Sequence, residues 1–471
     1  MSEGSWPIVA LGELIESIEA GSSFRCRETP PEQGEVGVAK VSAVSWGRYD
    51  EQESKTCLDP SRINKDLLIR KGDFLISRAN TVELVGACVI AEQVRKQVML
   101  SDKTLRIVFK DPSLKPWVLH FLRSRAGRQQ IEALCTGNQE SMRNISQRSL
   151  RQIGLPLAPP DEREEILAFI EEQLSRAGAT SKTLQAIQAK LKQARASILK
   201  AAVEGRLVEN EADLTPTENM SCATGVELLE AIRGSHSEFI AGVLGKSTKK
   251  RTQSKASETT QHHATEQLPP GWAIAKWEEI GACINGRNFP SSEYQTTGVK
   301  LLRPGNLGPD GKTTWPPSKT KCLPQRFADE NPMQCLANGD IVMNLTAQSL
   351  KDDFLGRACI VNTTEPCLLN QRIARLVPNM ILKPYALMVF MSPQFRTFVK
   401  TLNTGSLIQH MFTKDINCFY FPIPSILEQQ RIAQEVDRRF SVLDKVETTV
   451  NDSLRRCGQL RQAVLKRMFG G

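Results

Sequence analysis

The 471-residue sequence has no run of eighteen apolar residues, and this absence excludes a membrane-spanning helix. The first residues, MSEGSWPIVALGEL, contain an early Glu and no basic segment, so they do not resemble a secretory signal. None of the twelve cysteines forms a CxxC pair, and only five histidines are present, so neither a zinc module nor a disulfide framework is indicated. We predict reduced, mostly buried thiols in a cytoplasmic protein with no membrane partner.

Motifs for catalysis are missing as well. GVLGKST (242–248) ends like a phosphate loop, but Ile240 stands where the first glycine belongs and a helical pattern precedes it. No Pro-Pro pair precedes an aromatic residue, as the tetrapeptide of amino-methyltransferases requires. The acidic residues show no convincing nuclease spacing, and the histidines form no Ser-His-Asp or metal-binding set. We therefore expect no catalytic residue and no metal ligand in this chain.

What remains is ordinary globular composition, with 40% hydrophobic and 24% charged residues. The length predicts two or three domains. A net charge of +9 permits a polyanionic partner without requiring one.

The sequence repeats itself at an offset of about 266 residues. LPLAPPDEREEILAFIEEQL (155–174) matches FPIPSILEQQRIAQEVDRRF (421–440), and KGDFLISRAN (71–80) matches NGDIVMNLTA (338–347). WPIVALGEL from Trp6 is echoed by WAIAKWEEI from Trp272. The shared positions are mainly Gly, Pro and apolar residues, which determine turns and core, whereas the polar residues between them differ. The chain is thus a duplication whose two copies have the same scaffold and different surfaces.

Each copy begins with strand-like segments and ends with a long helical pattern. Short apolar runs bounded by turn residues fill 1–154 and 268–420, with a helix expected at 116–133 and at 384–400. Beyond Asp161 and Ser425, which we expect to be N-caps, apolar residues recur at heptad spacing. Neither helix can bury its apolar stripe alone, so an antiparallel pair is predicted.

Together these patterns predict an α+β protein with two duplicated mixed α/β domains separated by two long antiparallel coiled-coil helices, with pseudo-twofold symmetry. The expected ranges are a first domain at 1–158, a first helix at 159–205, a connector at 206–267, a second domain at 268–424 and a second helix at 425–471.

The connector has three parts. Residues 208–221 are acidic and turn-rich, 226–244 have helical spacing, and 246–267 are polar low-complexity sequence. The last part contains a basic run: Lys246, Lys249, Lys250, Arg251 and Lys255. We expect a solvated linker here, and an arm that contacts phosphates is the alternative.

The doubled proline hinge that leads into a heptad helix resembles the specificity subunit of type I restriction–modification systems, as do the W-x-x-x-x-L-G-E-L start and the G-D strand motif. The resemblance implies two target-recognition domains that each read half of a bipartite, asymmetric DNA site, with the helices fixing the gap. It implies two methyltransferase subunits as partners, which methylate adenine N6 with S-adenosylmethionine bound to them and not to this chain. Two restriction subunits join where a system includes them. The helix expected at 226–244 is similar to one that helps to hold methyltransferase subunits in some members.

Candidate DNA contacts lie in the variable stretches between shared blocks, because side chains of Arg, Lys, Asn and Gln distinguish bases. These stretches are 77–81 and 138–148 in the first domain, and 303–306, 344–351 and 406–414 in the second. The residues are Arg78, Asn80, Gln139, Arg143, Asn144, Arg303, Asn306, Asn344, Gln348, Lys351, Gln409, His410 and Lys414.

Two other interpretations stay open on the sequence. The chain could be a two-headed scaffold whose domains bind proteins, in which case its affinity would ignore salt. It could also be a fused enzyme with its own methylation activity, which would bind S-adenosylmethionine alone.

Overall fold

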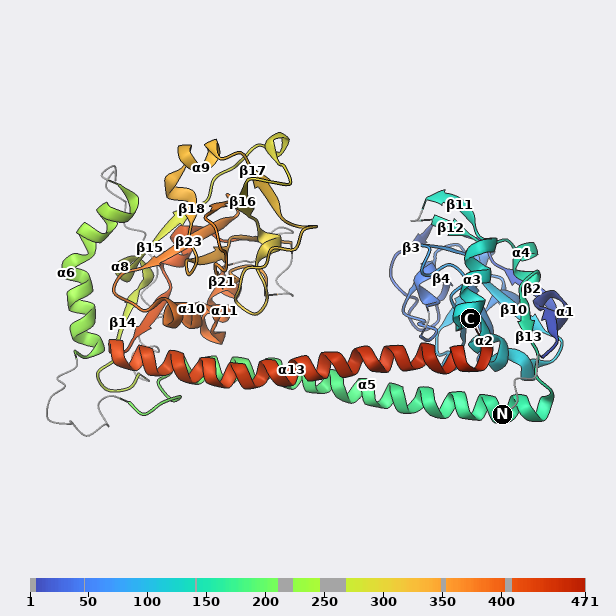
Figure 1. Ribbon diagram of the computed structural model, residues 1–471. Coiled ribbons are helices and arrows are strands. Elements are labelled where there is room, and N and C mark those ends of the chain that lie inside the picture. The colour runs from blue at the N-terminus through green and yellow to red at the C-terminus, as the bar shows by residue number, and fades with distance from the viewer. Residues whose placement is uncertain are drawn as a thin grey trace. The chain divides into compact units, whose positions relative to one another are not determined.

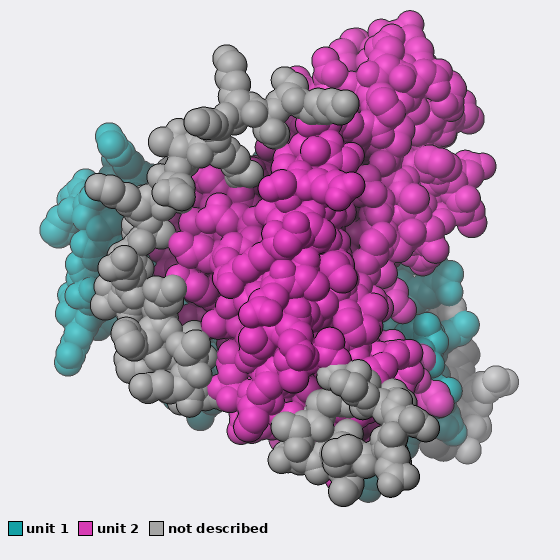
Figure 2. All heavy atoms as spheres, turned by 90° about the vertical axis from the view of Figure 1, so that its left-hand side faces the viewer, with its two compact units in different colours: residues 1–186, 450–471 teal, residues 187–449 magenta. Residues whose placement is uncertain are grey.

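The computed structural model describes residues 6–45, 47–139, 142–210, 223–245, 268–348, 353–402 and 409–470, without the side chains of 138 and 139. The chain divides into two compact units, Met1–Ala186 with Val450–Gly471 (unit 1) and Ile187–Thr449 (unit 2), coloured separately in Figure 2. Each unit contains one globular part and one end of each long helix (Figure 1). Lys351 and the basic run at 246–255 lie outside the described residues.

Unit 1 is built on two four-stranded sheets. The first has the antiparallel order β2 (Ile15–Ala20), β10 (Thr104–Phe109), β6 (Phe74–Ser77) and β8 (Cys88–Ile90). The second has the order β3 (Cys26–Arg27), β5 (Ser54–Cys57), β4 (Val36–Ala39) and β9 (Gln97–Met99), with β4 and β9 parallel. Smaller elements complete it: β1 (Ile8–Ala10) paired with β13 (Gly154–Pro156), and helices α1 (Leu11–Leu14), α2 (Lys115–Arg123), α3 (Arg125–Leu134) and α4 (Gln147–Arg151).

Unit 2 repeats this plan. Its first sheet has the order β15 (Gly281–Asn285), β23 (Ile373–Pro378), β19 (Ile341–Asn344) and β21 (Ala358–Ile360). Its second sheet has the order β17 (Lys321–Leu323), β16 (Val299–Leu302), β22 (Cys367–Leu369) and β18 (Cys335–Leu336), with β16 and β22 parallel. Strands β14 (Ala273–Lys276) and β25 (Tyr420–Ile423) pair, and the helices are α8 (Trp277–Ile280), α9 (Arg326–Glu330), α10 (Lys383–Met391), α11 (Pro393–Thr401) and α12 (Thr413–Asn417). The prediction of a duplicated α+β scaffold is confirmed.

The proline hinge is held in the same way in both units. Trp117 is fully buried, and its indole Nε1 donates to the carbonyl of Pro156 at 2.8 Å. Tyr385 takes the corresponding place in unit 2, where its hydroxyl donates to the carbonyl of Pro422 at 3.1 Å. Because a buried aromatic donor needs a partner, this bond fixes the hinge strand to the helix behind it.

Two helices of 44 residues follow the hinges, α5 (Pro160–Val203) and α13 (Ile426–Phe469). Ser425 caps α13 as predicted, since its Oγ accepts from the Glu428 amide at 3.1 Å. The N-cap prediction for Asp161 is wrong, because α5 already begins at Pro160. A proline with its fixed φ is well suited to the first helical position, and this places Asp161 within the first turn.

Within unit 2 the two helices run antiparallel. Arg195 of α5 pairs with Asp444 and with Glu447, the latter at 2.8 Å. Further along α5, Leu199, Ala202 and Val203 share a core with residues earlier in α13, namely Ile432, Ala433 and Val436. Residues with higher numbers in α5 therefore contact residues with lower numbers in α13. The two helices are antiparallel, as predicted.

Unit 1 contains the opposite ends of the same helices. Ile166 and Ile170 of α5 belong to a core that also holds the end of α13. The ring of Phe469 packs edge-on against Trp117, with 5.0 Å between centroids. The last turn of α13 is therefore part of the core of unit 1.

The helices expected at 116–133 and 384–400 are each split in two, so this prediction was wrong in detail. Ser124 lies between α2 and α3 with an extended backbone, and its Oγ accepts from the Gly127 amide at 3.2 Å. Ser392 has the same role before α11, where it accepts from the Phe395 amide at 3.3 Å. A serine that caps the second helix ends the first.

The helix predicted in the connector is confirmed as α6 (Gly225–Leu244). Thr224 and Glu227 form a capping box at its start. Leu228, Leu229 and Ile232 bury this end against the core of unit 2. No described helix is long and apolar enough to cross a membrane.

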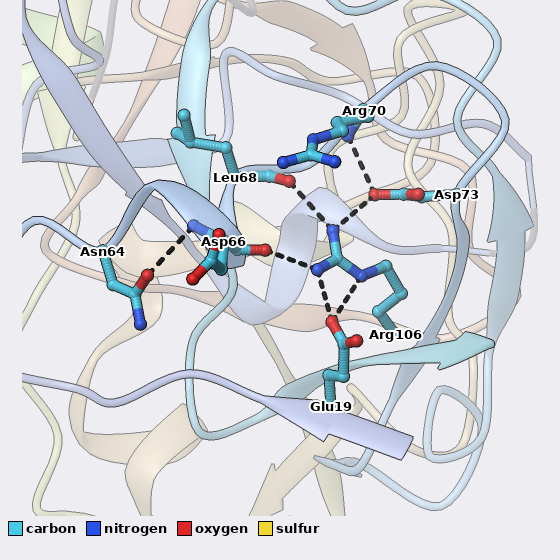
Figure 3. Close-up of polar contacts among 7 residues, drawn as sticks. All are labelled: Glu19, Asn64, Asp66, Leu68, Arg70, Asp73 and Arg106. Atoms are coloured by element: carbon cyan, nitrogen blue, oxygen red, sulfur yellow. Dashed lines mark hydrogen bonds and ion pairs between the residues drawn. The ribbon is translucent and has the colours of Figure 1, made fainter. Parts of the chain in front are cut away.

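A buried arginine fixes a long loop onto the first sheet of unit 1 (Figure 3). Arg106 of β10 is 8% exposed, and its guanidinium donates to the carbonyls of Asp66 at 2.6 Å and Leu68 at 2.9 Å. It also pairs with Asp73 at 2.9 Å and with Glu19. Every nitrogen of this guanidinium thus has a partner, and the loop from Asp66 to Asp73 depends on it.

We expect Arg106→Met to lower the free energy of unfolding by about 3 kcal/mol, because it leaves two partly buried carboxylates without their cation. Chemical denaturation of the whole chain measures this. The matched control is Arg27→Met, whose ion pair with Glu35 is largely exposed to solvent and should contribute much less to stability. Equal losses in the two variants would show that the Arg106 network does not stabilise the loop.

Candidate nucleic-acid interface

Two predicted stretches of the first domain come together in unit 1. Strand β12 (Met142–Asn144) pairs antiparallel with β7 (Ala79–Asn80), placing Arg143 opposite Asn80, and β11 (Thr136–Gln139) adds a third strand. The carbonyl of Arg78 accepts from the Ile145 amide at 3.0 Å. Residues 77–81 and the described residues of 138–148 therefore form one small surface, although about sixty residues separate them.

The side chains on this surface are partly exposed: those of Arg78, Asn80, Arg143 and Asn144. Asn80 uses its Oδ1 to accept from the Thr81 amide at 2.9 Å, which leaves its NH2 group available for other contacts. Gln139 lies in β11, but its side chain is outside the part of the chain that the structure describes. The surface thus offers both guanidinium and amide groups.

The corresponding stretches of the second domain also meet. Strand β20 (Thr346–Ala347) pairs antiparallel with β24 (Gln409–His410), with Thr346 opposite His410. The side chains of Gln348, His410 and Lys414 are exposed. Gln409 is 9% exposed, so its side chain is directed largely into the protein.

Two predicted contact residues are fully buried. Asn306 accepts from the Arg303 amide at 3.1 Å and donates to the Thr314 carbonyl at 3.0 Å. Asn344 donates to the carbonyls of Thr346 at 2.7 Å and Phe354 at 2.9 Å. Both carboxamides shape the loops around them, so we leave these two residues out of the proposed contact surface.

A polar hollow of about 530 Å³ opens beside these loops in unit 2. Three loops form it: the one after β15, the one after β16, and the one between β22 and β23. Its lining contains no carboxylate and consists of Asn288, Phe289, Pro290, Ser291, Ser292, Tyr294, Arg303, Pro304, Asn370, Gln371 and Arg372. Of these only Arg303 was predicted from the sequence.

Unit 1 has loops at the same positions with different chemistry. The amide of Leu345 donates to the Arg372 carbonyl at 2.9 Å, and the amide of Arg78 donates to the Lys103 carbonyl at 2.8 Å. In unit 1, however, Ser23 donates to a carboxylate, that of Asp102. The same backbone framework thus presents Gln371 and Arg372 in one unit and Asp102 and Lys103 in the other.

A glycine brings the first of these loops against the third in each unit. A Cβ on Gly286 would lie 2.0 Å from the Asn370 carbonyl oxygen, and one on Gly21 would lie 1.9 Å from that of Leu100. Both distances are far below van der Waals contact. The shared sequence G-x-x-F, GSSF and GRNF, is the signal that could have located this site.

Among the described residues there is no group of three metal-ligating side chains. Burial lowers the pKa of His120 to about 4, and the neighbouring Arg123 adds to this shift. His120 on α2 is therefore neutral, and its imidazole is part of the packing of that helix.

Gly286→Ala should destabilise unit 2 by about 1–3 kcal/mol, since the loop has to move away from Asn370 to admit the methyl group. Thermal unfolding of the whole chain tests this. Gly305→Ala is the control, because a Cβ at that position in the next loop meets nothing within 4 Å. If both variants melt at the same temperature, the close approach of the loops is not required.

No family model matches the chain. It is 31% identical over 186 residues to the EcoEI specificity subunit of a type I restriction enzyme from Escherichia coli, which is 39% of this chain and 31% of the relative. It is 25% identical over 281 residues to the EcoAI specificity subunit from the same species, which is 59% of this chain and 44% of the relative. The chain thus spans less than half the length of these relatives.

The fold has a counterpart among solved structures. A chain from a study of complex assembly and conformational transition of the type I R-M system superposes with a TM-score of 0.57 at 17% identity, covering 99% of this chain and 98% of the other. At this identity the likeness establishes the fold alone. The two matched relatives are both type I restriction enzyme specificity subunits, and it is to proteins of this kind that the chain is similar in sequence.

Proposed function

We propose that this chain gives a type I restriction–modification complex its DNA sequence specificity. The domain at 1–158 reads one half of a bipartite, asymmetric site, and the domain at 268–424 reads the other. One observation carries the proposal: both units have the same loop framework, and its polar side chains differ. Two unlike half-sites require this combination of a shared scaffold and unlike surfaces.

The chemistry of the exposed side chains suits DNA. Guanidinium and amide groups form paired hydrogen bonds with base edges in the major groove, and lysines neutralise phosphates. Arg78, Asn80 and Arg143 provide such groups in unit 1, and Gln348, His410 and Lys414 provide them in unit 2. We retain Gln139, Asn144 and Lys351 as predicted contacts.

The long helices would have two tasks. Residues 159–205 and 425–471 set the distance between the half-sites, since a 44-residue helix spans about 66 Å. They also dock two methyltransferase subunits, which transfer a methyl group from their own S-adenosylmethionine to adenine N6. Restriction subunits join the same complex in systems that restrict. This chain contributes recognition in the cytoplasm and catalyses no step.

Long-read methylation sequencing tests this proposal. A methylation-free host expresses the chain together with its methyltransferase, and we expect N6-methyladenine at a split, asymmetric motif with a fixed gap. The control expresses the methyltransferase alone. No motif from an intact complex would contradict the proposal and favour a protein-binding scaffold, whose affinity for its partner would not fall steeply with salt.

The spacing task makes a separate prediction. Removing one heptad from α5 and the facing heptad from α13 shortens the pair by roughly 10 Å, which is about three base-pair steps. We expect methylation either at a site with a gap shorter by about that amount or not at all. Removing seven residues from the polar segment 246–267 is the control and should leave the gap unchanged. An active shortened protein with the original gap would rule out the spacing task.

A further inference from the structure

The hollow of unit 2, defined by its lining above, has a surplus of hydrogen-bond donors. Arg303 and Arg372 both line it, and neither forms an ion pair within the described part of the chain. A guanidinium has five N–H donors and no acceptor, so two of them lining one hollow without carboxylates favour a ligand rich in acceptors.

The two guanidinium groups are held on fixed backbone. The Arg303 amide donates to Asn306, and its guanidinium lies over the ring of Tyr294, 5.6 Å from the centroid. The Arg372 amide donates to the Asn370 side chain at 3.1 Å, and its carbonyl accepts from Leu345. The backbone of each arginine is therefore positioned by hydrogen bonds, while Arg372 is exposed and Arg303 is partly exposed.

Amide groups on the same loops add directional contacts. Gln371 and Asn288 are exposed and line the hollow. The Gln371 amide donates to the Arg287 carbonyl at 2.9 Å, which joins the loop after β15 to the loop before β23. The hollow thus combines two positive charges with side chains that both donate and accept.

We propose that this hollow is a DNA-contact site, in which Arg303 and Arg372 hold an acceptor-rich group of the second half-site, with Gln371 and Asn288 as neighbours. The inference rests on the proposed function. In duplex DNA two groups have this chemistry: a backbone phosphate, and the O6 and N7 edge of guanine.

The corresponding place in unit 1 is built for a different group. Asp102 stands there where unit 2 has Gln371, and Lys103 stands where unit 2 has Arg372. The Asp102 carboxylate accepts from Ser23. A carboxylate such as that of Asp102 suits the amino group of cytosine, whereas a carboxamide such as that of Gln371 both donates and accepts and suits adenine. The two units would therefore distinguish their half-sites partly at this shared position.

The test uses the complex of the full chain with its methyltransferase subunits. The variants are Arg303→Ala, Arg372→Ala and Gln371→Ala, with Lys400→Ala as the control, because this exposed lysine on α11 does not line the hollow. Each complex is assayed by methylation sequencing, and by its affinity for motif DNA and for DNA altered at each position of the second half-site, at several salt concentrations.

If the arginines read a base, discrimination at one position of the second half-site falls between about 5-fold and 150-fold, while the first half-site stays unchanged. If they hold a phosphate, affinity falls equally for all sequences, and the slope of log affinity against log salt decreases by about 0.9 for each phosphate that the variant no longer neutralises. Either result supports the site, and the two results identify which group it holds.

The inference is overturned if both arginine variants keep the wild-type motif, affinity and salt slope. Gln371→Ala is the control for misfolding. We expect it to reduce discrimination at the same position as Arg372→Ala does, in a complex whose melting temperature equals that of the wild type. If the wild-type complex shows no split motif at all, the proposed function itself has failed, and this outcome is separate from a failure of the hollow.

Discussion

The structure depends on the burial of the apolar stripes of two long helices. Each stripe is only partly covered by the globular part that precedes it, and the remainder needs the other helix. In unit 1 the last turn of α13 completes the core, where Phe469 packs on Trp117. In unit 2 the last turns of α5 do the same, where Val203 is buried with Ile432. Unit 1 is therefore built from two separate stretches of the sequence, and each unit requires a helix segment from both copies of the duplication.

Packing of the scaffold also explains which residues are shared by the two copies and which residues differ. The hinge bond from Trp117 or Tyr385 to a proline carbonyl, and the glycine contacts at Gly21 and Gly286, involve backbone atoms or buried rings. Residues that project from the loops between these points contribute little to packing. They can change without disturbing the scaffold, as Asp102 and Gln371 illustrate, and this freedom is what a protein that reads different DNA sequences needs.

Much of the fold could be predicted from the sequence, because periodicity and repetition are local signals. The duplicated scaffold, the antiparallel helices, the Ser425 cap and helix α6 were predicted correctly. The breaks at Ser124 and Ser392 were missed, since a capping serine inside an apolar pattern looks like any polar helical residue. Pairing of residues 77–81 with 138–148 required tertiary structure. So did the burial of Asn306 and Asn344, which polarity alone placed on the surface. Arg372 was overlooked because only the folded loops bring it to the same hollow as Arg303.

The central claim is that two separate parts of one chain contact two separate DNA segments. Hydroxyl-radical footprinting of the assembled complex on DNA that contains its methylation motif measures this most directly. The account predicts strong protection at two segments that coincide with the two half-sites, and weaker or no sequence-dependent protection between them. A single protected segment that covers only one half-site, or protection that does not move with the motif, would contradict it.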